Sequence, residues 1–205
     1  MMQDASIPKR RARNSLNQAE IVQASLEIIN QEGVDGFSMR RISKKLGCSI
    51  ASPYSYFKGQ QEILGLVIFE GERRLAEMIS SSRTVGNTTF KRLTSIAEAY
   101  FNFSGKNREL HKAMGKTSFR RRYKKTFPIL SLGYRIFLRT IRDGVYSKEF
   151  QISSREIPLI ARAMYSWIYG IVSLVSEDSS GRRNKEDSLQ EGISLFHKLL
   201  LRESS

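Results

Sequence analysis

Apolar side chains recur every three or four residues along most of the chain, the spacing that places them on one face of an α-helix. Asn17 followed by Glu20 predicts the start of the first helix, because each side chain can accept a hydrogen bond from the other residue's backbone N–H. Gly33 predicts the end of this helix. β-Branched residues do not alternate with polar ones over any long stretch, so strands are not expected. The apolar stripe of the first helix consists of Ile21, Val22, Leu26, Ile28 and Ile29.

Two shorter helical segments follow, joined by a tight turn. Ser38 can cap the first segment, which is expected to end at Gly47. Ser49 can cap the second, which is expected over residues 50–56. Two short helices joined by a glycine-containing turn, here residues 46–49, form the helix-turn-helix pattern, although ordinary helical bundles also contain tight corners. The apolar side of the first segment consists of Met39, Ile42 and Leu46.

A longer helix, predicted over residues 60–79, connects this N-terminal part to the rest of the chain. The stretch 80–89 is rich in Ser, Thr, Gly and Asn and is predicted to be a linker. We therefore expect an all-α protein with a basic N-terminal arm (1–14), a three-helix helix-turn-helix domain (15–59) and a C-terminal helical bundle (85–205). Further helical patterns in the bundle occupy residues 90–101, 127–141, 157–175 and 189–200.

Charge points to a polyanionic partner. The 205 residues include 40% apolar and 26% charged side chains, a globular composition, and carry a net charge of +14. Such a balance favours nucleic acid, anionic lipid or a phosphorylated ligand as the partner, without choosing among them. Cys48 is the one cysteine, so no disulfide can form within the chain, and a reducing, intracellular setting fits best. Four of the bases lie in the N-terminal arm: Lys9, Arg10, Arg11 and Arg13.

The apolar segments do not indicate a secreted or membrane protein. Residues 1–14 lack the apolar core of a secretory signal. Residues 157–175 are apolar and long enough to span a bilayer, but Pro158 and Arg162 interrupt them. A buried helix or a dimer seam is the favoured interpretation, so we expect a cytoplasmic protein without a membrane partner.

Catalytic and metal-binding patterns are absent from the sequence. His111 and His197 fall in different predicted helices, and Cys48 lies in the helix-turn-helix turn, where a small packed residue is the usual role. The HExxH, GxSxG, P-loop and GxGxxG patterns do not occur. We therefore expect a non-enzyme with no cofactor and no metal.

The second helix of a helix-turn-helix enters the major groove with its N-terminal residues toward the bases. Ile50 and Ala51 could touch thymine methyl groups there, and the hydroxyls of Ser49 and Ser52 could donate or accept hydrogen bonds. Arginine, lysine and tyrosine side chains nearby are suited to phosphates. The basic arm could lie along the minor groove, or it could be a disordered solubilising tail. The predicted DNA contacts are Arg10, Arg11, Arg40, Arg41, Ser49, Ile50, Ala51, Ser52, Tyr54, Tyr56 and Lys58.

The stretch 21–64 resembles the DNA-binding domain of the TetR/AcrR family of bacterial transcriptional regulators. The resemblance covers the whole N-terminal unit in order, whereas the second half matches only in the number and layout of its helices. Three positions depart from the family pattern: Pro53 replaces the usual Leu or Ile, Tyr56 the common His, and Gln60 a frequent Lys. Pro53 lacks an N–H and would distort the recognition helix. The matching residues are Gly33, Ser38, Arg40, Ile42, Leu46, Gly47, the run Tyr54-Ser55-Tyr56-Phe57, Glu62 and Leu64.

The resemblance implies a homodimer that binds a palindromic operator, usually as a repressor released by a small molecule. Residues 85–205 would then bind the effector and form the dimer, through residues 157–175 and 189–201. Helix 60–79 would couple the effector to the DNA-binding domain, because it joins the two. Carried over by position, the residues facing DNA would be Arg40, Ser49, Ile50, Ala51, Ser52, Tyr54 and Tyr56.

The bundle is rich in aromatic residues and carries a net charge of +11. Nine bases against Glu109 lie between Lys106 and Lys125, forming a solvated face, an access route for an anionic ligand, or an extra contact with DNA. An acidic amphiphile would suit the combination of apolar lining and nearby bases. The alternative is an architectural or adaptor protein that binds DNA and docks a protein through this basic cluster. The predicted effector-lining residues are Tyr100, Phe103, Phe119, Tyr123, Phe127, Tyr134, Phe137 and Trp167.

Overall fold

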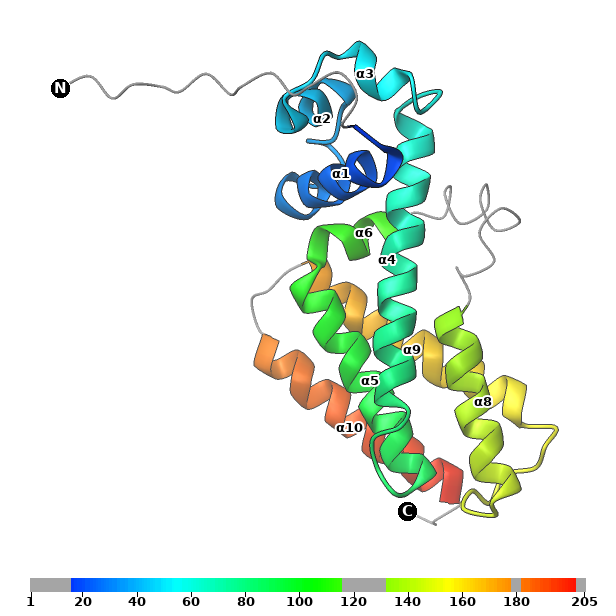
Figure 1. The fold of residues 1–205 in the computed structure, drawn as a ribbon. Helices are drawn as coiled ribbons and strands as arrows, with labels where there is room; N and C mark the ends of the chain where they lie inside the picture. Colours follow the sequence, from blue (N-terminus) through cyan, green and yellow to red (C-terminus); the bar gives the residue numbers. More distant parts are fainter. Residues whose placement is uncertain (1–15, 116–131, 178–181, 202–205) are drawn as a thin grey trace. The chain divides into compact units, whose positions relative to one another are not determined.

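The computed structural model describes residues 16–115, 132–177 and 182–201 (Figure 1). The described residues form helices and no strand, which confirms the predicted all-α class. The chain divides into two compact units between Ile68 and Phe69. This boundary lies inside helix α4 (Gln60–Ser82), so α4 contributes residues to both units. Arg10 and Arg11 of the predicted arm lie outside the described residues.

The first unit contains α1 (Gln18–Glu32), α2 (Met39–Leu46), α3 (Ala51–Tyr54) and the start of α4. The predicted cap of α1 is present: the Asn17 side chain accepts from the Glu20 N–H at 2.9 Å, and the Glu20 carboxylate accepts from the Asn17 N–H at 3.3 Å. The core of the first unit is apolar, and the burial of each large side chain contributes about 1.5–3 kcal/mol to stability. The core includes Ile21, Leu26, Ile28, Ile29, Phe37, Met39, Ile42, Phe57, Ile63, Leu64 and Val67.

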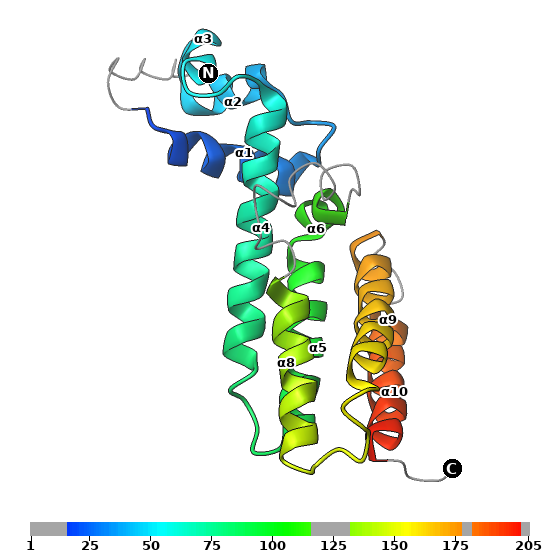
Figure 2. The ribbon, with the colours of Figure 1, turned by 90° about the vertical axis from the view of Figure 1, so that its right-hand side faces the viewer.

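The second unit is a helical bundle built around α9. α9 packs against α5, α6, α8 and α10, and α5 also packs against α8. Figures 1 and 2 show α9 and α10 side by side along much of their length. The fold class therefore extends to the C-terminal part as predicted. The helices are α5 (Thr89–Lys106), α6 (Arg108–Gly115), α8 (Leu132–Tyr146), α9 (Ile157–Glu177) and α10 (Arg182–Leu201).

Several helix boundaries differ from the sequence expectation. α4 continues to Ser82, three residues into the predicted linker, and α10 begins at Arg182, seven residues before Leu189. α6 was not predicted; its buried side chains are Leu110, His111, Ala113 and Met114. The predicted segment 127–141 is described only from residue 132, where α8 begins. These differences lie at polar helix ends or in a short helix, where apolar spacing gives little signal.

The start of α5 is held by a carboxylate from the segment after α8. The Glu149 side chain accepts hydrogen bonds from the backbone N–H groups of Thr89 at 2.7 Å and Phe90 at 2.8 Å. These are N–H groups of a helix N-terminus, which lack partners inside the helix and attract negative charge. Burial raises the pKa of Glu149, but these hydrogen bonds outweigh it and hold the pKa below its usual value.

α9 has the length and hydropathy of a membrane-spanning helix over its window Ile157–Leu174, which is 33% buried. Composition of this kind is weak evidence for a membrane, because core helices of bundles share it. Four neighbouring helices cover one side of α9. Among the described residues, Leu159 and Leu174 of α9 remain exposed, so the helices that pack against α9 leave these two leucines open to solvent.

Candidate DNA-binding surface

The turn between α2 and α3 depends on a glycine. The Ser38 hydroxyl accepts from the Arg41 N–H at 3.2 Å and starts α2 as predicted. Gly47 ends α2 with φ +65°, in the left-handed region that L side chains rarely adopt. The N–H groups of Gly47 and Cys48 then satisfy the last carbonyls of α2, the Cys48 bond to Ser43 being 3.0 Å long. This turn sets the direction in which α3 leaves.

The recognition helix α3 is shorter than predicted. It spans four residues, Ala51–Tyr54, and begins after Ile50 rather than at a Ser49 cap. The Ser49 hydroxyl instead lies 2.9 Å from the Ser52 hydroxyl. Pro53 has no N–H to give the Ser49 carbonyl, which accepts from the Ser52 N–H at 3.0 Å instead. The predicted cap and the predicted extent to residue 56 are therefore wrong, and the missing N–H removes the first hydrogen bond that a helix capped by Ser49 would have.

α3 exposes the side chains expected to face DNA. Ile50 and Tyr54 are each 54% exposed, although both are large and partly apolar. Ser49 and Ala51 are exposed too, while Ser52 is half-buried. The opposite side of this segment is anchored, because Pro53 and Phe57 are buried in the core. A short, rigidly seated helix thus presents small residues around one exposed isoleucine, which permits close approach to a groove.

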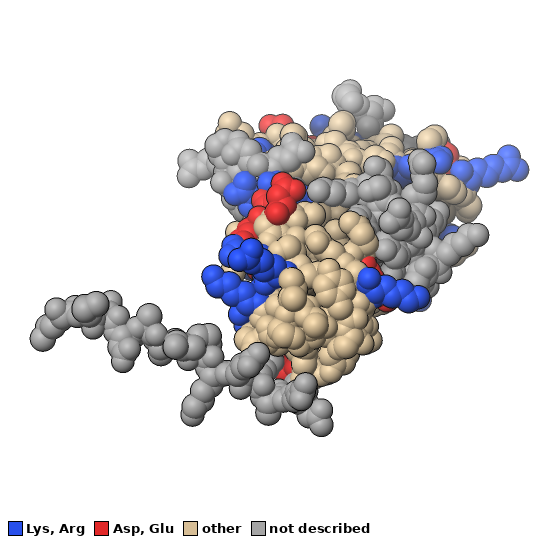
Figure 3. All heavy atoms as spheres, turned by 90° about the horizontal axis from the view of Figure 1, so that it is seen from above, with Lys and Arg blue, Asp and Glu red and all other residues tan. Residues whose placement is uncertain are grey.

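Three bases near α3 are available to a polyanion. Arg40, Lys44 and Lys58 are exposed, and their side chains form no ion pair within the described ranges. On the face drawn in Figure 3, Lys and Arg side chains lie on either side of an uncharged area. Cations flanking a neutral surface suit a contact in which phosphates lie outside and base edges lie between.

Arg41 differs from these bases, because Glu32 engages it. The Arg41 guanidinium forms an ion pair with the Glu32 carboxylate, including an Nε–Oε2 hydrogen bond of 3.0 Å. Lys45 is paired in the same way with Glu27, at 3.0 Å. Hydrogen bonds from Gln23 and Lys45 hold the pKa of Glu27 below its usual value. A phosphate contact by Arg41 would therefore compete with Glu32.

Tyr56 and Gln60, two departures from the family pattern, both make contacts within the first unit. The Tyr56 hydroxyl donates to the Leu16 carbonyl at 2.5 Å. The Gln60 side chain donates to the Phe37 carbonyl at 2.8 Å and so ties the start of α4 to the α1–α2 connection. Neither role was predicted from sequence, because each joins residues more than twenty positions apart.

The predicted effector-lining residues fall into two places in the second unit. Phe137 and Trp167 line a small apolar cavity of about 10 Å³, room for roughly one water molecule. Tyr100 and Phe103 are buried, and Tyr134 packs edge-on to Tyr165 with ring centres 5.3 Å apart. Phe119, Tyr123 and Phe127 lie outside the described residues. The cavity is completed by Phe90, Leu93, Thr94, Ala97, Met164, Ile168, Ile193 and Phe196.

A polar group missed by the sequence analysis lies among these aromatics. His111 is 2% exposed, and its Nε2 lies 3.3 Å from the Tyr100 hydroxyl. Its ring also approaches Tyr169, with centroids 6.0 Å apart. The sequence signal that could have indicated this cluster is the four-residue spacing of Tyr165 and Tyr169, which places both on one face of α9. Over the ranges described, no group of His, Cys, Asp and Glu is suited to hold a metal ion.

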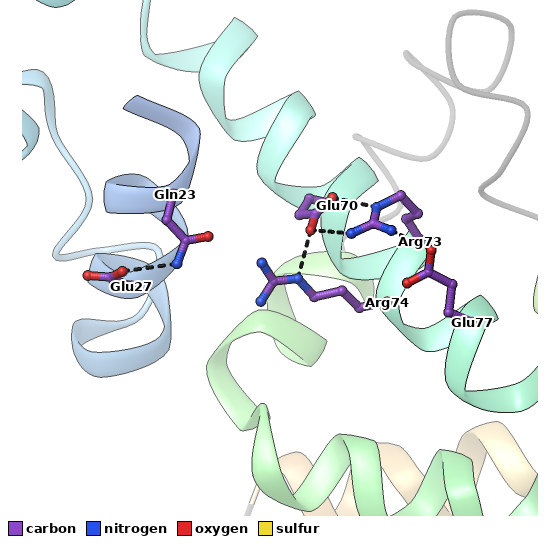
Figure 4. A network of polar contacts seen from close by, with 6 residues as sticks. All are labelled: Gln23, Glu27, Glu70, Arg73, Arg74 and Glu77. Carbon is purple, nitrogen blue, oxygen red and sulfur yellow. Dashed lines mark hydrogen bonds and ion pairs between the residues drawn. The ribbon is translucent and has the colours of Figure 1, made fainter. Parts of the chain in front are cut away.

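An ion-pair cluster stabilises α4 inside the second unit (Figure 4). Glu70 accepts from Arg73 Nε at 2.7 Å and from Arg74 Nε at 2.7 Å, and Arg73 also contacts Glu77. The Arg73 hydrogen bond, supported by Arg74 and opposed by burial, lowers the pKa of Glu70 from 4.5 to about 2. Such i,i+3 and i,i+4 pairs favour a continuous helix.

Comparison with known proteins finds a family match in the N-terminal part of the chain. The family model described as "Bacterial regulatory proteins, tetR family" matches residues 21–67. The uncharacterized HTH-type transcriptional regulator YobS of Bacillus subtilis (strain 168) is 27% identical over 183 residues, covering 89% of each chain. The HTH-type transcriptional repressor DrrR1 of Streptomyces coeruleorubidus is 35% identical over 66 residues, which are 32% of this chain and 24% of that protein.

A solved structure shares the fold over almost the whole chain. It is the transcriptional regulator FadR from Bacillus subtilis in complex with stearoyl-CoA, with a TM-score of 0.67 at 17% identity, covering 92% of this chain and 100% of that chain. The matched family model lies over α1–α3 and the start of α4, where the exposed recognition helix is found. The family match over residues 21–67 and the relative that is similar over 89% of the chain support a TetR family DNA-binding transcriptional regulator, and the shared fold agrees with it.

Proposed function

We propose that the protein binds a palindromic operator as a homodimer, with α3 in the major groove, and represses transcription in the cytoplasm until a small-molecule effector releases it. The observation that carries this proposal is the short helix α3, whose exposed Ile50 and Tyr54 stand near exposed Arg40 and Lys44. A seated helix with exposed apolar residues and nearby cations has the chemistry of a groove reader. The named repressor DrrR1 supports the direction of regulation.

Base recognition in this proposal rests on small side chains. Ile50 and Ala51 touch thymine methyl groups, and the Ser49–Ser52 hydroxyl pair bonds base edges. α3 offers no Arg, Asn or Gln for a bidentate base contact. Affinity therefore comes mainly from phosphate contacts by Arg40, Lys58 and the hydroxyl of Tyr54, with Arg10 and Arg11 of the arm adding to them.

The dimer forms through the uncovered faces of α9 and α10. Leu159 and Leu174 of α9 are 62% and 51% exposed, and Leu195 and Leu199 of α10 are 66% and 48% exposed. Small residues between them on α9, such as Ala163, permit close helix approach. Exposed leucines gathered on two neighbouring helices indicate a surface that another chain covers.

The effector in this proposal is an acidic amphiphile that enters the second unit beside Trp167 and Phe137. Their cavity is lined almost wholly by apolar side chains, and it would have to widen to admit an acyl chain. The buried His111–Tyr100 pair offers polar contacts nearby. FadR from Bacillus subtilis, which shares this fold, was solved with stearoyl-CoA. Bases of the Lys106–Lys125 cluster, most of which lies outside the described residues, would bind the acidic end.

Effector class is tested by thermal unfolding in the presence of small molecules. Fatty acids and acyl-CoA esters are expected to raise the melting temperature, because a ligand that binds only the folded state stabilises it. Fatty alcohols of equal chain length serve as the uncharged control. Stabilisation by unrelated neutral compounds, with no response to any anionic amphiphile, would contradict the acidic class.

Operator binding is tested by selecting duplexes from a random DNA pool. The expected product is an inverted repeat that a Tyr54→Phe/Arg40→Ala double variant no longer enriches. Arg135→Ala is the matched control, because this exposed arginine lies on α8 and is expected to leave enrichment unchanged. Enrichment of no sequence, with only salt-sensitive bulk binding, would refute a sequence-specific reader and favour a partner at the basic cluster.

A further inference from the structure

Tyr56 joins the end of the recognition segment, residues 51–56, to Leu16, which is the root of the basic arm. Its hydroxyl donates to the Leu16 carbonyl at 2.5 Å, and its own carbonyl accepts from the Gln18 side-chain amide at 3.4 Å. Tyr56 is thus bonded to residues on both sides of Asn17, the cap of α1. These contacts span 38 and 40 positions in sequence, so they form only when the first unit is folded.

The backbone that bears the Tyr56 side chain is itself anchored. The N–H groups of Tyr56 and Phe57 both donate to the Pro53 carbonyl at 3.1 Å. Pro53 and Phe57 are buried in the core of the first unit. The hydroxyl therefore extends from an anchored backbone, and the Leu16 carbonyl that it meets precedes α1 and has no partner inside that helix.

A direct phosphate contact by this hydroxyl conflicts with the geometry. A tyrosine hydroxyl has one proton to donate, and here the Leu16 carbonyl accepts it. Phosphate oxygens only accept hydrogen bonds, so Tyr56 could donate to phosphate only after releasing Leu16. Within the described residues, no such hydrogen bond is found for the hydroxyl of the exposed Tyr54.

The bases of the arm lie close to Leu16 in sequence. Arg13 is three residues before Leu16, and Arg10 is six residues before it. An extended chain covers at most about 3.3–3.6 Å per residue, so the position of Leu16 limits how far from α3 the charges of the arm can reach. Fixing the root beside α3 therefore keeps the arm's charges within reach of the DNA that α3 contacts, and it reduces the entropy lost when the arm binds.

We propose that Tyr56 is a positioning residue that acts on DNA affinity through the basic arm, by holding Leu16 beside the recognition segment, and not by contacting phosphate. The proposal rests on the DNA-binding function described above. It gives the tyrosine at this position a role in placing the N-terminal arm. Arg40 and Tyr54 keep their own contacts, which do not depend on the arm.

A double-mutant cycle separates the two roles of Tyr56. Tyr56→Phe removes only the hydroxyl, and a second variant replaces Lys9, Arg10, Arg11 and Arg13 by alanine in the full chain. Affinity is measured by fluorescence anisotropy on the duplex enriched from the random pool. Tyr56→Phe is expected to weaken binding about three- to tenfold in the native chain, the effect of roughly one hydrogen bond, and not at all in the arm variant.

Tyr54→Phe is the matched control for this cycle. It removes an exposed hydroxyl on the same segment and is expected to weaken binding by the same factor with and without the arm charges. An equal loss for Tyr56→Phe in both backgrounds, or no loss in either, overturns the proposal. Melting temperatures of all variants identify any loss that comes from unfolding.

A second measurement needs no DNA and tests the contact itself. A spin label is attached at Asn14→Cys in a Cys48→Ser background, and its mobility is recorded by electron paramagnetic resonance. Tyr56→Phe is expected to raise the mobility of the label, and Tyr54→Phe to leave it unchanged. Unchanged mobility in Tyr56→Phe would refute the proposal. Failure of the native chain to bind any enriched duplex would instead refute the proposed operator binding.

Discussion

Backbone conformation at a single residue fixes the orientation of the recognition helix. Gly47 adopts φ +65° between α2 and α3, and no heavy atom of the described chain lies within 4 Å of the position of an added Cβ. A substitution there is therefore strained in its backbone without a steric clash. The effect of Gly47→Ala isolates the conformational requirement of the turn.

We predict that Gly47→Ala lowers the free energy of unfolding by about 1–2 kcal/mol, the cost of the left-handed region for an L residue. Urea denaturation followed by circular dichroism measures this change. Gly59→Ala is the control, because its surroundings are equally open and its φ is not positive. Equal losses in both variants would show that the turn does not require glycine.

The Glu70 carboxylate makes the stability of α4 depend on pH. Its pKa is lowered from 4.5 to about 2 by Arg73 and Arg74, so the charged form is favoured in the folded state. A lowered pKa contributes stability above the unfolded value of 4.5, and this contribution is lost as pH falls toward 2. Because Arg73 and Arg74 are about 40% exposed, solvent screens the pairs and reduces their contribution.

We predict that Glu70→Gln costs about 1 kcal/mol of unfolding free energy at pH 6, and that this difference shrinks as pH approaches 2.5. Denaturation of both proteins at a series of pH values measures the difference. Glu62→Gln, on the same helix, has no comparable pair with arginine among the described contacts and serves as a control. A difference that is constant across the series would contradict the ion-pair account.

At the scale of elements, the packing of α9 on α10 depends on the absence of a side chain at Gly192. A Cβ added there would lie 1.9 Å from a ring carbon of Trp167, which also packs edge-on against Phe196. Trp167 is the one tryptophan of the chain, so the tryptophan fluorescence reports on the surroundings of this residue.

We predict that Gly192→Ala destabilises the second unit by about 1–3 kcal/mol, the usual cost of overpacking, and shifts the Trp167 emission to longer wavelength. Thermal unfolding and fluorescence spectra measure the two effects. Ser194→Ala, an exposed substitution two residues along α10, is expected to change neither. An unshifted spectrum with native stability would mean that α10 does not depend on this close approach.

The sequence predicted those elements whose signals are local. The Asn17–Glu20 cap, Ser38 and the two end glycines mark α1 and α2, because capping joins residues three apart. α3 was predicted too long, since no glycine directly follows Tyr54 to mark its end, unlike the ends of α1 and α2. The Tyr56–Leu16 contact could not be predicted at all, because forty residues separate its partners. Exposure of Ile50 followed from the helix-turn-helix pattern, whereas the burial of His111 needed the packing of α6.

At the scale of the whole molecule, the proposed function depends on two surfaces that belong to different units. α3 lies in the first unit and the exposed leucines of α9 and α10 lie in the second. α4 crosses the boundary between the units, so it is the covalent element through which a change in one can reach the other. A palindromic operator requires two copies of α3, and the leucine face is what supplies the second copy in the proposed dimer.

We predict that Leu195→Glu dissociates this dimer. Leu195 is 66% exposed in the monomer, so a glutamate there is tolerated by the fold, but burying its charge in an apolar interface has no compensating partner. The dimer dissociation constant, measured by sedimentation equilibrium, is expected to rise at least about a hundredfold, since burying an unpaired charge costs several kcal/mol. Binding to an inverted repeat should then fall to the level of a single half-site.

Tyr146→Glu provides the comparison for this variant. Tyr146 is 72% exposed and lies on α8, which is not one of the two helices that carry the exposed leucines, so its replacement adds the same charge on a different helix. It is expected to remain dimeric and to bind the inverted repeat with native affinity. If Leu195→Glu also remained dimeric while retaining the native melting temperature, the pairing of the two recognition helices would have to come from another surface, and the exposed leucines would need a different partner.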